Sequence, residues 1–192
     1  MTSYLRFETP PFDKREIERY AKSVGNENLS QLIDECIEQC DGILNYNVGF
    51  CELNFTIKDN LCDFGAFFVR SEALLRNIFE AKKLVLFVAS IGHGIDRLIA
   101  KYSRTSPLKA LIFNAIGTER VEDLADSFVA WLEKEASLKA LPRFSAGYGD
   151  LPLEVQKDIF DFLKPEKQIG VFLSDSFVMS PSKSVTAFVG LK

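Results

Sequence analysis

The chain has 192 residues, of which 47% are hydrophobic and 26% are charged, a balance typical of a globular protein with ample material for a core. Its formal net charge of −4 argues against a protein that binds nucleic acid through a broad basic surface. The first ten residues contain no apolar segment of signal-peptide length, and the longest apolar run, 84–91, is too short to span a bilayer, so we expect a cytoplasmic protein.

The N-terminal segment predicts a strand followed by a helix. Residues 2–8 alternate in polarity, and the two prolines that follow shortly afterwards favour the end of a strand. Asp13 is a suitable N-cap for a helix that we expect to end at Gly25.

A second helix is expected to begin at Asn28 or Ser30. Its apolar residues recur at the spacing of one helical face: Leu32, Ile33, Cys36, Ile37, Cys40, Ile43 and Leu44.

The four cysteines are Cys36, Cys40, Cys51 and Cys62. A zinc site would need two close pairs, and the single histidine, His93, is distant in the sequence. We therefore expect reduced, partly buried thiols and no metal site.

The middle of the chain predicts two strands and a short helix. Residues 49–57 alternate with a period of two, and residues 63–71 are either the partner strand or the segment leading into the next helix. Ser71 is a good N-cap for a helix over 71–82. Residues 84–91 are continuously apolar, which indicates a strand buried on both faces.

A glycine turn at 92–94 then leads into a helix over 95–103. A strand, a glycine turn and a helix can together form an anion site. However, the turn lacks the G-x-G-x-x-G spacing of dinucleotide-binding folds, and no second strand–helix unit follows. We therefore interpret His93 as a loop or packing residue.

Residues 107–137 are predominantly helical. We expect one helix that breaks near Gly117 and a second that is capped by Thr118. Glu122 and Asp126 are four residues apart, so both carboxylates project from one edge of the second helix. They could form a functional pair or simply part of a solvated face.

The last part of the chain predicts a helix and two strands. Residues 153–163 form an amphipathic pattern that stops before Pro165. Residues 168–177 and 184–191 have strand patterns and are joined through 179–183. Helices and strands alternate without a regular βαβ rhythm, so we expect an α+β fold with a partly antiparallel sheet.

The loop RFSAGYGDLP, residues 143–152, concentrates residues with special properties. Arg143 offers a planar fork for a carboxylate, and Tyr148 offers a flat ring and a hydroxyl. Gly147 and Gly149 allow close approach to the backbone, and Pro152 suits the first turn of the next helix. The loop is either a small-ligand site or a glycine-rich turn with a surface arginine.

Two motifs resemble the activation domain of cobalamin-dependent methionine synthase, in a short, stand-alone form. The first contains Arg143, Gly147 and Tyr148. The second contains Ser176, Phe177, Met179, Pro181, Ser184 and Val185. The resemblance covers roughly residues 70–191, and it implies a single α+β domain over 1–192 in which helices surround a twisted, mainly antiparallel sheet.

The resemblance also implies a task in methionine biosynthesis. Activation domains bind S-adenosylmethionine and present it to cobalamin during reductive remethylation, with an electron donor such as flavodoxin. They act as components of a methyltransferase only together with the cobalamin-binding part. No cobalamin-binding signature is present in this sequence, and His93 does not fit one, so the cobalamin would come from a partner, either methionine synthase or another corrinoid protein.

The ligand-binding residues are carried over by the same resemblance. Arg143 would hold the ligand carboxylate, and Asp126, with Glu122 one turn away, would hold its ammonium. The same site would be lined by Gly147, Tyr148, Gly149 and Asp150. No catalytic acid or base and no metal ligand is implied.

Three departures keep an alternative open. Proline usually follows the Gly-Tyr pair in large family members, but Gly149 stands here. A carboxylate that shortly precedes the family arginine has no match in 137–142, and the chain ends at Lys192 where the large members continue. The alternative is an interaction module that keeps the fold without the ligand. An independent small-molecule methyltransferase is disfavoured, because the usual Rossmann unit is not visible.

Overall fold

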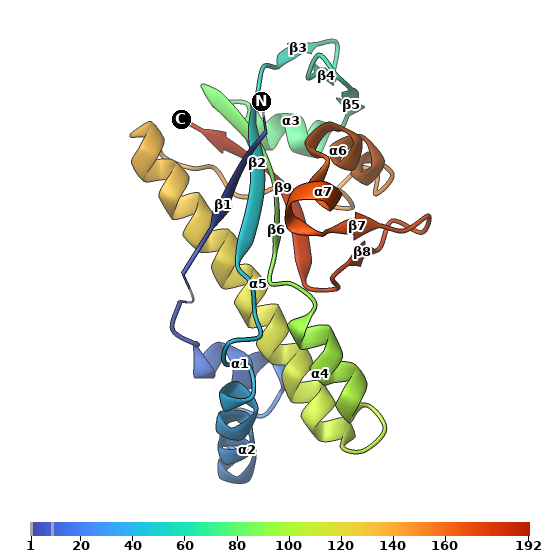
Figure 1. Cartoon of the computed structure of the whole chain (residues 1–192). Coiled ribbons are helices and arrows are strands. Elements are labelled where there is room, and N and C mark those ends of the chain that lie inside the picture. Colours follow the sequence, from blue (N-terminus) through green and yellow to red (C-terminus); the bar gives the residue numbers. More distant parts are fainter. Residues whose placement is uncertain (1, 9) are drawn as a thin grey trace.

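A computed structural model describes residues 2–8 and 10–192. Its centre is a four-stranded antiparallel sheet in the order β1-β2-β6-β9 (Figure 1). These strands span Ser3–Arg6 (β1), Asn47–Leu53 (β2), Lys83–Ser90 (β6) and Ser184–Leu191 (β9). The predicted class, helices around an antiparallel sheet, is confirmed.

The central strand β6 shows why both faces of the sheet are covered. Its buried side chains alternate between two hydrophobic cores, with Val85, Phe87 and Ala89 in one and Leu84, Leu86 and Val88 in the other. The long helix α5 (Pro107–Ala136) closes the first core, and α6 (Val155–Leu163) closes the second. The prediction of a doubly buried strand at 84–91 is confirmed.

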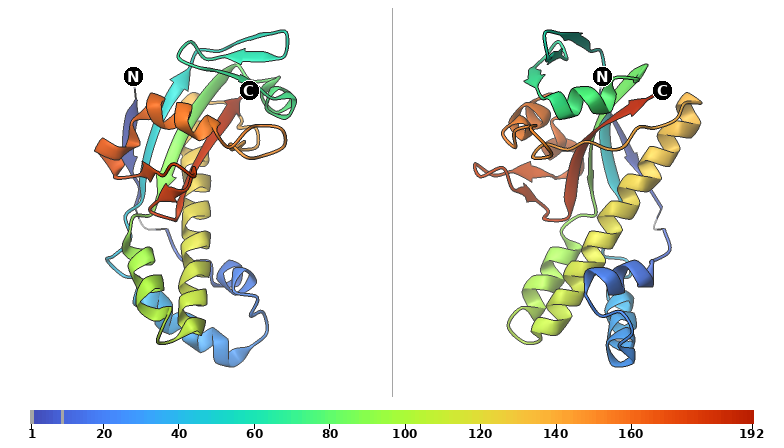
Figure 2. Two further views of the ribbon diagram at one scale, coloured as in Figure 1. Left: turned by 90° about the vertical axis from the view of Figure 1, so that its right-hand side faces the viewer. Right: turned by 180° about the vertical axis from the view of Figure 1, so that it is seen from behind.

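Below the sheet, three helices pack around the N-terminal half of α5 (Figures 1 and 2). They are α1 (Lys14–Tyr20), α2 (Glu27–Glu38) and α4 (Gly94–Tyr102). Asp13 caps α1 as expected, because its carboxylate accepts hydrogen bonds from the amides of Arg15 and Glu16. This helix ends at Tyr20 rather than Gly25, and α2 begins earlier than expected, with Asn26 as its N-cap.

The remaining elements surround the upper part of the sheet. A small sheet contains β3 (Thr56–Lys58), β4 (Leu61–Asp63) and β5 (Phe68–Arg70), followed by α3 (Glu72–Ile78). A short helix α7 (Pro165–Ile169) and a hairpin of β7 (Phe172–Leu173) and β8 (Met179–Ser180) precede β9. In the described ranges, no helix is both long and apolar enough to cross a membrane.

The expected break near Gly117 is wrong, because α5 continues without interruption through this position. Thr118 does not cap a new helix, and its hydroxyl instead donates to the carbonyl of Asn114 within α5 at 2.9 Å. A Cβ at Gly117 would lie 2.9 Å from Cγ of Lys183 and 3.0 Å from Cγ1 of Ile95. This glycine therefore provides room for neighbouring side chains rather than a helix end.

Strand partners also differ from the expectations. Residues 49–57 divide into β2 and β3, and the strand within 63–71, β5, pairs with β4. Residues 168–177 and 184–191 do not form one hairpin, because β7 pairs with β8 while β9 pairs with β6. The local sequence patterns therefore located strands but did not identify the strands with which they pair.

Candidate functional site

The predicted residues Arg143, Glu122 and Asp126 meet at the side of α5. After α5 the chain reverses at Ser137, which has a φ of 52°, and then runs beside β9 through bridges that include Phe144 with Phe188. This path returns Arg143 to the helix, where its Nη2 lies 2.8 Å from Oε2 of Glu122 and 3.0 Å from Oδ1 of Asp126.

The three charged side chains differ in their exposure to solvent. The side chain of Arg143 is 24% exposed, whereas those of Glu122 and Asp126 are 44% and 71% exposed. Exposed ion pairs of this kind contribute little to stability, on the order of 0–1 kcal/mol. Because both carboxylates are exposed, the cluster is open to a ligand. Its two formal negative charges and one positive charge favour the binding of a cation.

The same two carboxylates border an acidic cleft of about 300 Å³. Its other lining residues are Asp13, Glu16, Tyr20, Glu119 and Asp123. The surroundings of Glu122 and Asp126 thus reinforce the negative potential of the cluster.

One side of α5 contacts two cationic side chains, those of Lys183 and Arg143. Asn114, Thr118, Glu122 and Asp126 recur every four residues and so lie along one side of the helix. Nζ of Lys183 lies 2.9 Å from both Oδ1 of Asn114 and Oγ1 of Thr118, and Thr118 is about one turn from Glu122, which Arg143 contacts. Desolvation lowers the pKa of Lys183. The role of Asn114 and Thr118 was not predicted from the sequence, although their four-residue spacing is visible there.

The glycine-rich loop has the backbone conformation that its composition favours. Gly147 and Gly149 have φ values of 88° and 56°, in the left-handed region. A Cβ at Gly149 would also lie 2.8 Å from Cβ of Ala73, so the loop packs closely against α3. Tyr148 is 59% exposed, and its ring meets that of Phe144 edge-on at 6.1 Å between centroids. An exposed flat ring is therefore available at this end of the loop.

The helix after this loop begins later than predicted. Pro152 does not start α6, because its first helical residue is Val155 and a turn at Leu153 and Glu154 intervenes. The amides of the first turn of α6 consequently lie farther along the chain from the loop than expected.

Asp150 is engaged with the N-terminus of α3. Its carboxylate accepts hydrogen bonds from Oγ of Ser71 at 2.5 Å and from the amides of Glu72 and Ala73 at 2.7 and 3.1 Å. Ser71 is the N-cap of α3, as the sequence predicted. These hydrogen bonds, the one from Ser71 above all, lower the pKa of Asp150 to about 2. The side chain of Asp150 thus fixes the loop to α3.

We expect this contact to make stability depend on pH in acid. A carboxyl with a depressed pKa in the folded state stabilises the fold above its unfolded pKa, and this contribution disappears as the pH falls from about 4 toward 2. Thermal unfolding of Asp150→Asn should therefore vary less with pH over this window than that of the unmodified protein. Asp175→Asn, in the exposed β7–β8 turn, is the control and should keep the original pH dependence. If the unfolding temperature changed with pH to the same extent in all three proteins, the prediction would be contradicted.

The second motif builds the turn that leads into β9. Phe177 has a φ of 60°, and the ammonium of Lys157 lies 5.2 Å from the centre of its ring. The hydroxyl of Ser184 lies 2.8 Å from both Oγ of Ser90 and the carbonyl of Pro181. These contacts position Lys183 beside α5.

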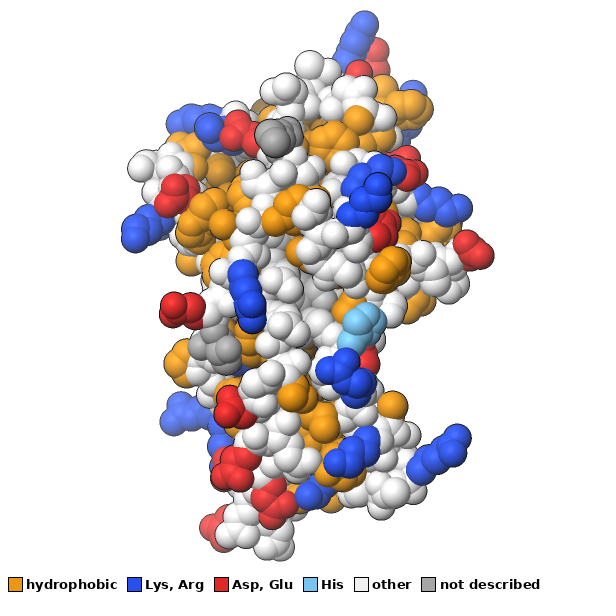
Figure 3. Space-filling view, in the orientation of Figure 1, with side chains coloured by type: hydrophobic (Ala, Val, Ile, Leu, Met, Phe, Trp, Pro, Cys, Tyr) orange, Lys and Arg blue, Asp and Glu red, His pale blue; other side chains and the backbone are white. Residues whose placement is uncertain are grey.

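His93 and the cysteines lie outside this cluster. Nδ1 of His93 lies 3.7 Å from Oδ2 of Asp96, and the histidine is visible at the surface in Figure 3. All four cysteines are buried, and burial raises the pKa of Cys36, Cys40 and Cys62 to about 11, 12 and 11. Across 2–8 and 10–192, no group of three or more candidate side chains could hold a metal ion.

Comparisons with known proteins place this geometry in a known fold. No protein-family model matches the sequence, and no curated protein matches it. Thirteen chains of solved structures do match, among them the crystal structure of the MetH reactivation domain bound to AdoHcy. That match has a TM-score of 0.73 at 13% sequence identity and covers 99% of this chain and 78% of the other. The chain therefore has the fold of the MetH reactivation domain.

Proposed function

We propose that this protein binds S-adenosylmethionine and supports the reductive remethylation of cobalamin held by a partner protein. The observation that carries the proposal is the cluster of Arg143 with Glu122 and Asp126, which holds both signs of charge that an amino-acid ligand requires. The fold shared with a domain that was crystallised with AdoHcy supports the same choice of ligand.

The residues present fit the amino-acid end of the ligand. Arg143 can exchange an internal carboxylate for that of the ligand and then form a bidentate, charge-assisted contact with it. The carboxylates of Glu122 and Asp126 are then available to accept hydrogen bonds from the ligand ammonium. Tyr148, exposed on the same loop, offers a surface for a flat ring.

The charge of the cluster favours S-adenosylmethionine over AdoHcy. S-adenosylmethionine carries one more positive charge, on its sulfonium, and the cluster together with the adjoining cleft is negative. We expect S-adenosylmethionine to bind several-fold more tightly at low ionic strength and this preference to shrink as salt screens the field. Asp126→Asn, which removes one negative charge from the cluster, should also reduce the preference for S-adenosylmethionine over AdoHcy.

The reacting groups come from the two ligands. S-adenosylmethionine supplies a methyl group, and the partner supplies the cobalamin. The contribution of this chain is to hold the ligand in one orientation, which requires no acid or base. The proposed partner is a cobalamin-binding methionine synthase or another corrinoid protein in the cytoplasm, with an electron donor such as flavodoxin and with no role for nucleic acid or membrane.

Calorimetric titration with S-adenosylmethionine tests the proposal. Arg143→Ala should weaken binding about tenfold or more, because a charge-assisted hydrogen bond contributes about 1.5–3 kcal/mol. Arg70→Ala, which removes an exposed arginine from β5, is matched in charge and should bind as the unmodified protein does. Far-ultraviolet circular dichroism of each variant checks that the fold is retained.

One observation favours the alternative of an interaction module without a ligand. The guanidinium of Arg143 already has two partners within the chain, and the carboxylate of Asp150 is held by α3. If millimolar S-adenosylmethionine gives neither heat nor thermal stabilisation, the ligand-binding proposal fails and the module becomes the better interpretation. Equal binding by Arg143→Ala would mean that the ligand lies elsewhere.

A further inference from the structure

Both internal contacts of Arg143 fall on one nitrogen of its guanidinium. Nη2 lies 2.8 Å from Oε2 of Glu122 and 3.0 Å from Oδ1 of Asp126. A guanidinium binds a carboxylate with two hydrogen bonds through Nε and Nη2 or through Nη1 and Nη2, so both arrangements require this nitrogen. A ligand carboxylate can therefore bind Arg143 in this way only after an internal carboxylate moves away.

The two internal carboxylates are not equivalent. Glu122 accepts a hydrogen bond from Nη2, whereas in the ranges 2–8 and 10–192 Asp126 contacts this nitrogen as an ion pair only. The side chain of Asp126 is 71% exposed and that of Glu122 is 44% exposed. Glu122 is thus the better-aligned partner of Arg143, and Asp126 has more of its surface available for the ammonium of a ligand.

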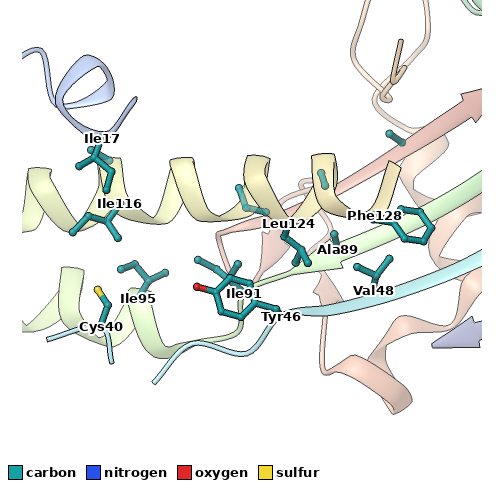
Figure 4. Close-up of a cluster of buried hydrophobic side chains, with 14 of the residues drawn as sticks. Ile17, Cys40, Tyr46, Val48, Ala89, Ile91, Ile95, Ile116, Leu124 and Phe128 are labelled. Atoms are coloured by element: carbon teal, nitrogen blue, oxygen red, sulfur yellow. The ribbon is translucent and has the colours of Figure 1, made fainter. Parts of the chain in front are cut away.

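The core beneath α5 fixes the rotation of this helix. Figure 4 shows Leu124 and Phe128 among the buried side chains between α5 and the sheet, and both residues are 0% exposed. Because a rotation of α5 would expose them, Glu122 must leave Arg143 by rotation of its own side-chain bonds. Exposed side chains change rotamer within picoseconds to nanoseconds, so this contact can exchange rapidly with a ligand.

We propose that Glu122 is an internal competitor of the ligand carboxylate. In the empty site it occupies Nη2 of Arg143, and a ligand with an amino-acid end displaces it while Asp126 receives the ammonium. This inference rests on the proposed function and assigns opposite effects to the two carboxylates. A ligand without a carboxylate cannot displace Glu122 from Arg143, so the competition concerns only ligands that carry one.

Calorimetric titration of Glu122→Gln with S-adenosylmethionine measures the competition. Exposed ion pairs are weak, so the internal pair should reduce the free fraction of Arg143, and with it the apparent affinity, by about two- to sixfold. Glu122→Gln keeps the shape of the side chain and removes its charge, so it should bind S-adenosylmethionine about two- to sixfold more tightly. A salt concentration of about 0.15 M limits the loss of long-range attraction that accompanies the lost negative charge.

A second ligand and two further variants separate competition from a general effect. Decarboxylated S-adenosylmethionine keeps the sulfonium and the ammonium, and Glu122→Gln should bind it equally or more weakly than the unmodified protein does. Glu135→Gln removes the same charge from an exposed position of α5 and should leave the affinity for both ligands unchanged. In the Arg143→Ala background, adding Glu122→Gln should not tighten binding, because no guanidinium remains to compete for.

The outcomes distinguish this inference from the proposed function. If neither the unmodified protein nor Glu122→Gln binds S-adenosylmethionine saturably up to millimolar ligand, both fail. If the unmodified protein binds and Glu122→Gln binds equally or more weakly, the ligand site stands and the competition is excluded. A gain in affinity for both ligands, or a gain that persists with Arg143→Ala, would also overturn the inference, since neither effect depends on a carboxylate at Arg143.

Discussion

Replacing Arg120 by alanine is expected to lower the free energy of unfolding by about 3–5 kcal/mol, because it leaves a buried carboxylate without its partner. The side chain of Arg120 is 0% exposed, and Glu119 beside it is 4% exposed. The guanidinium donates to both oxygens of Glu119 and to the carbonyls of Pro10 and Pro11, the latter two at 2.7 and 2.9 Å. The pair thus connects the segment before α1 to the middle of α5.

Urea unfolding followed by circular dichroism measures this effect. Arg19→Ala, which removes an exposed arginine paired with Glu16, is the control and should change the midpoint little. Adding Glu119→Gln to Arg120→Ala removes the stranded charge, so the double variant should be more stable than Arg120→Ala alone. A single variant that unfolds at the same urea concentration as Arg19→Ala would contradict the prediction.

Replacing Phe128 by alanine is expected to lower the free energy of unfolding by a similar amount, about 3–5 kcal/mol, because it leaves a cavity in the core between α5 and the sheet. Phe128 is 0% exposed. Its ring lies with centroids 4.9–6.3 Å from four other aromatic rings, those of Phe7, Phe50, Phe87 and Trp131.

The single tryptophan gives a direct signal for this experiment. Trp131 stacks on Phe128 with the centroids 5.9 Å apart, so its fluorescence reports on the same core during denaturant unfolding. Leu111→Ala lies on the same helix at a position that is 49% exposed, and it should lose far less stability. If both variants lost the same free energy of unfolding, the aromatic cluster around Phe128 would contribute no more to stability than an exposed position.

The acidic edge of α5 shows which features of the candidate site could be predicted from the sequence and which required the folded structure. The four-residue spacing of Glu122 and Asp126 was enough to predict that both carboxylates share one edge of a helix. The contact with Arg143 requires the reversal at Ser137 and the bridges to β9. The periodicity of the sequence does not predict this path of the chain. The resemblance named the three residues, but only the folded chain brings Arg143 to within 2.8 Å of Glu122 and 3.0 Å of Asp126.

Elements that depend on neighbouring residues could be predicted from the sequence alone. The N-caps Asp13 and Ser71, the doubly buried strand β6 and the amphipathic helix α6 follow from side chains a few positions apart. The sequence alone therefore determined the class of the fold and the composition of the glycine-rich loop.

The tertiary structure decided which distant segments meet. It joined β9 to β6, anchored Asp150 to Ser71 across 79 residues and kept α5 continuous through Gly117, where space for Lys183 and Ile95 explains the glycine better than a helix end. The physical reason is that helix periodicity and capping are set by contacts within about one turn. Strand partners, helix crossings and ion pairs instead depend on how the whole chain buries its two hydrophobic cores.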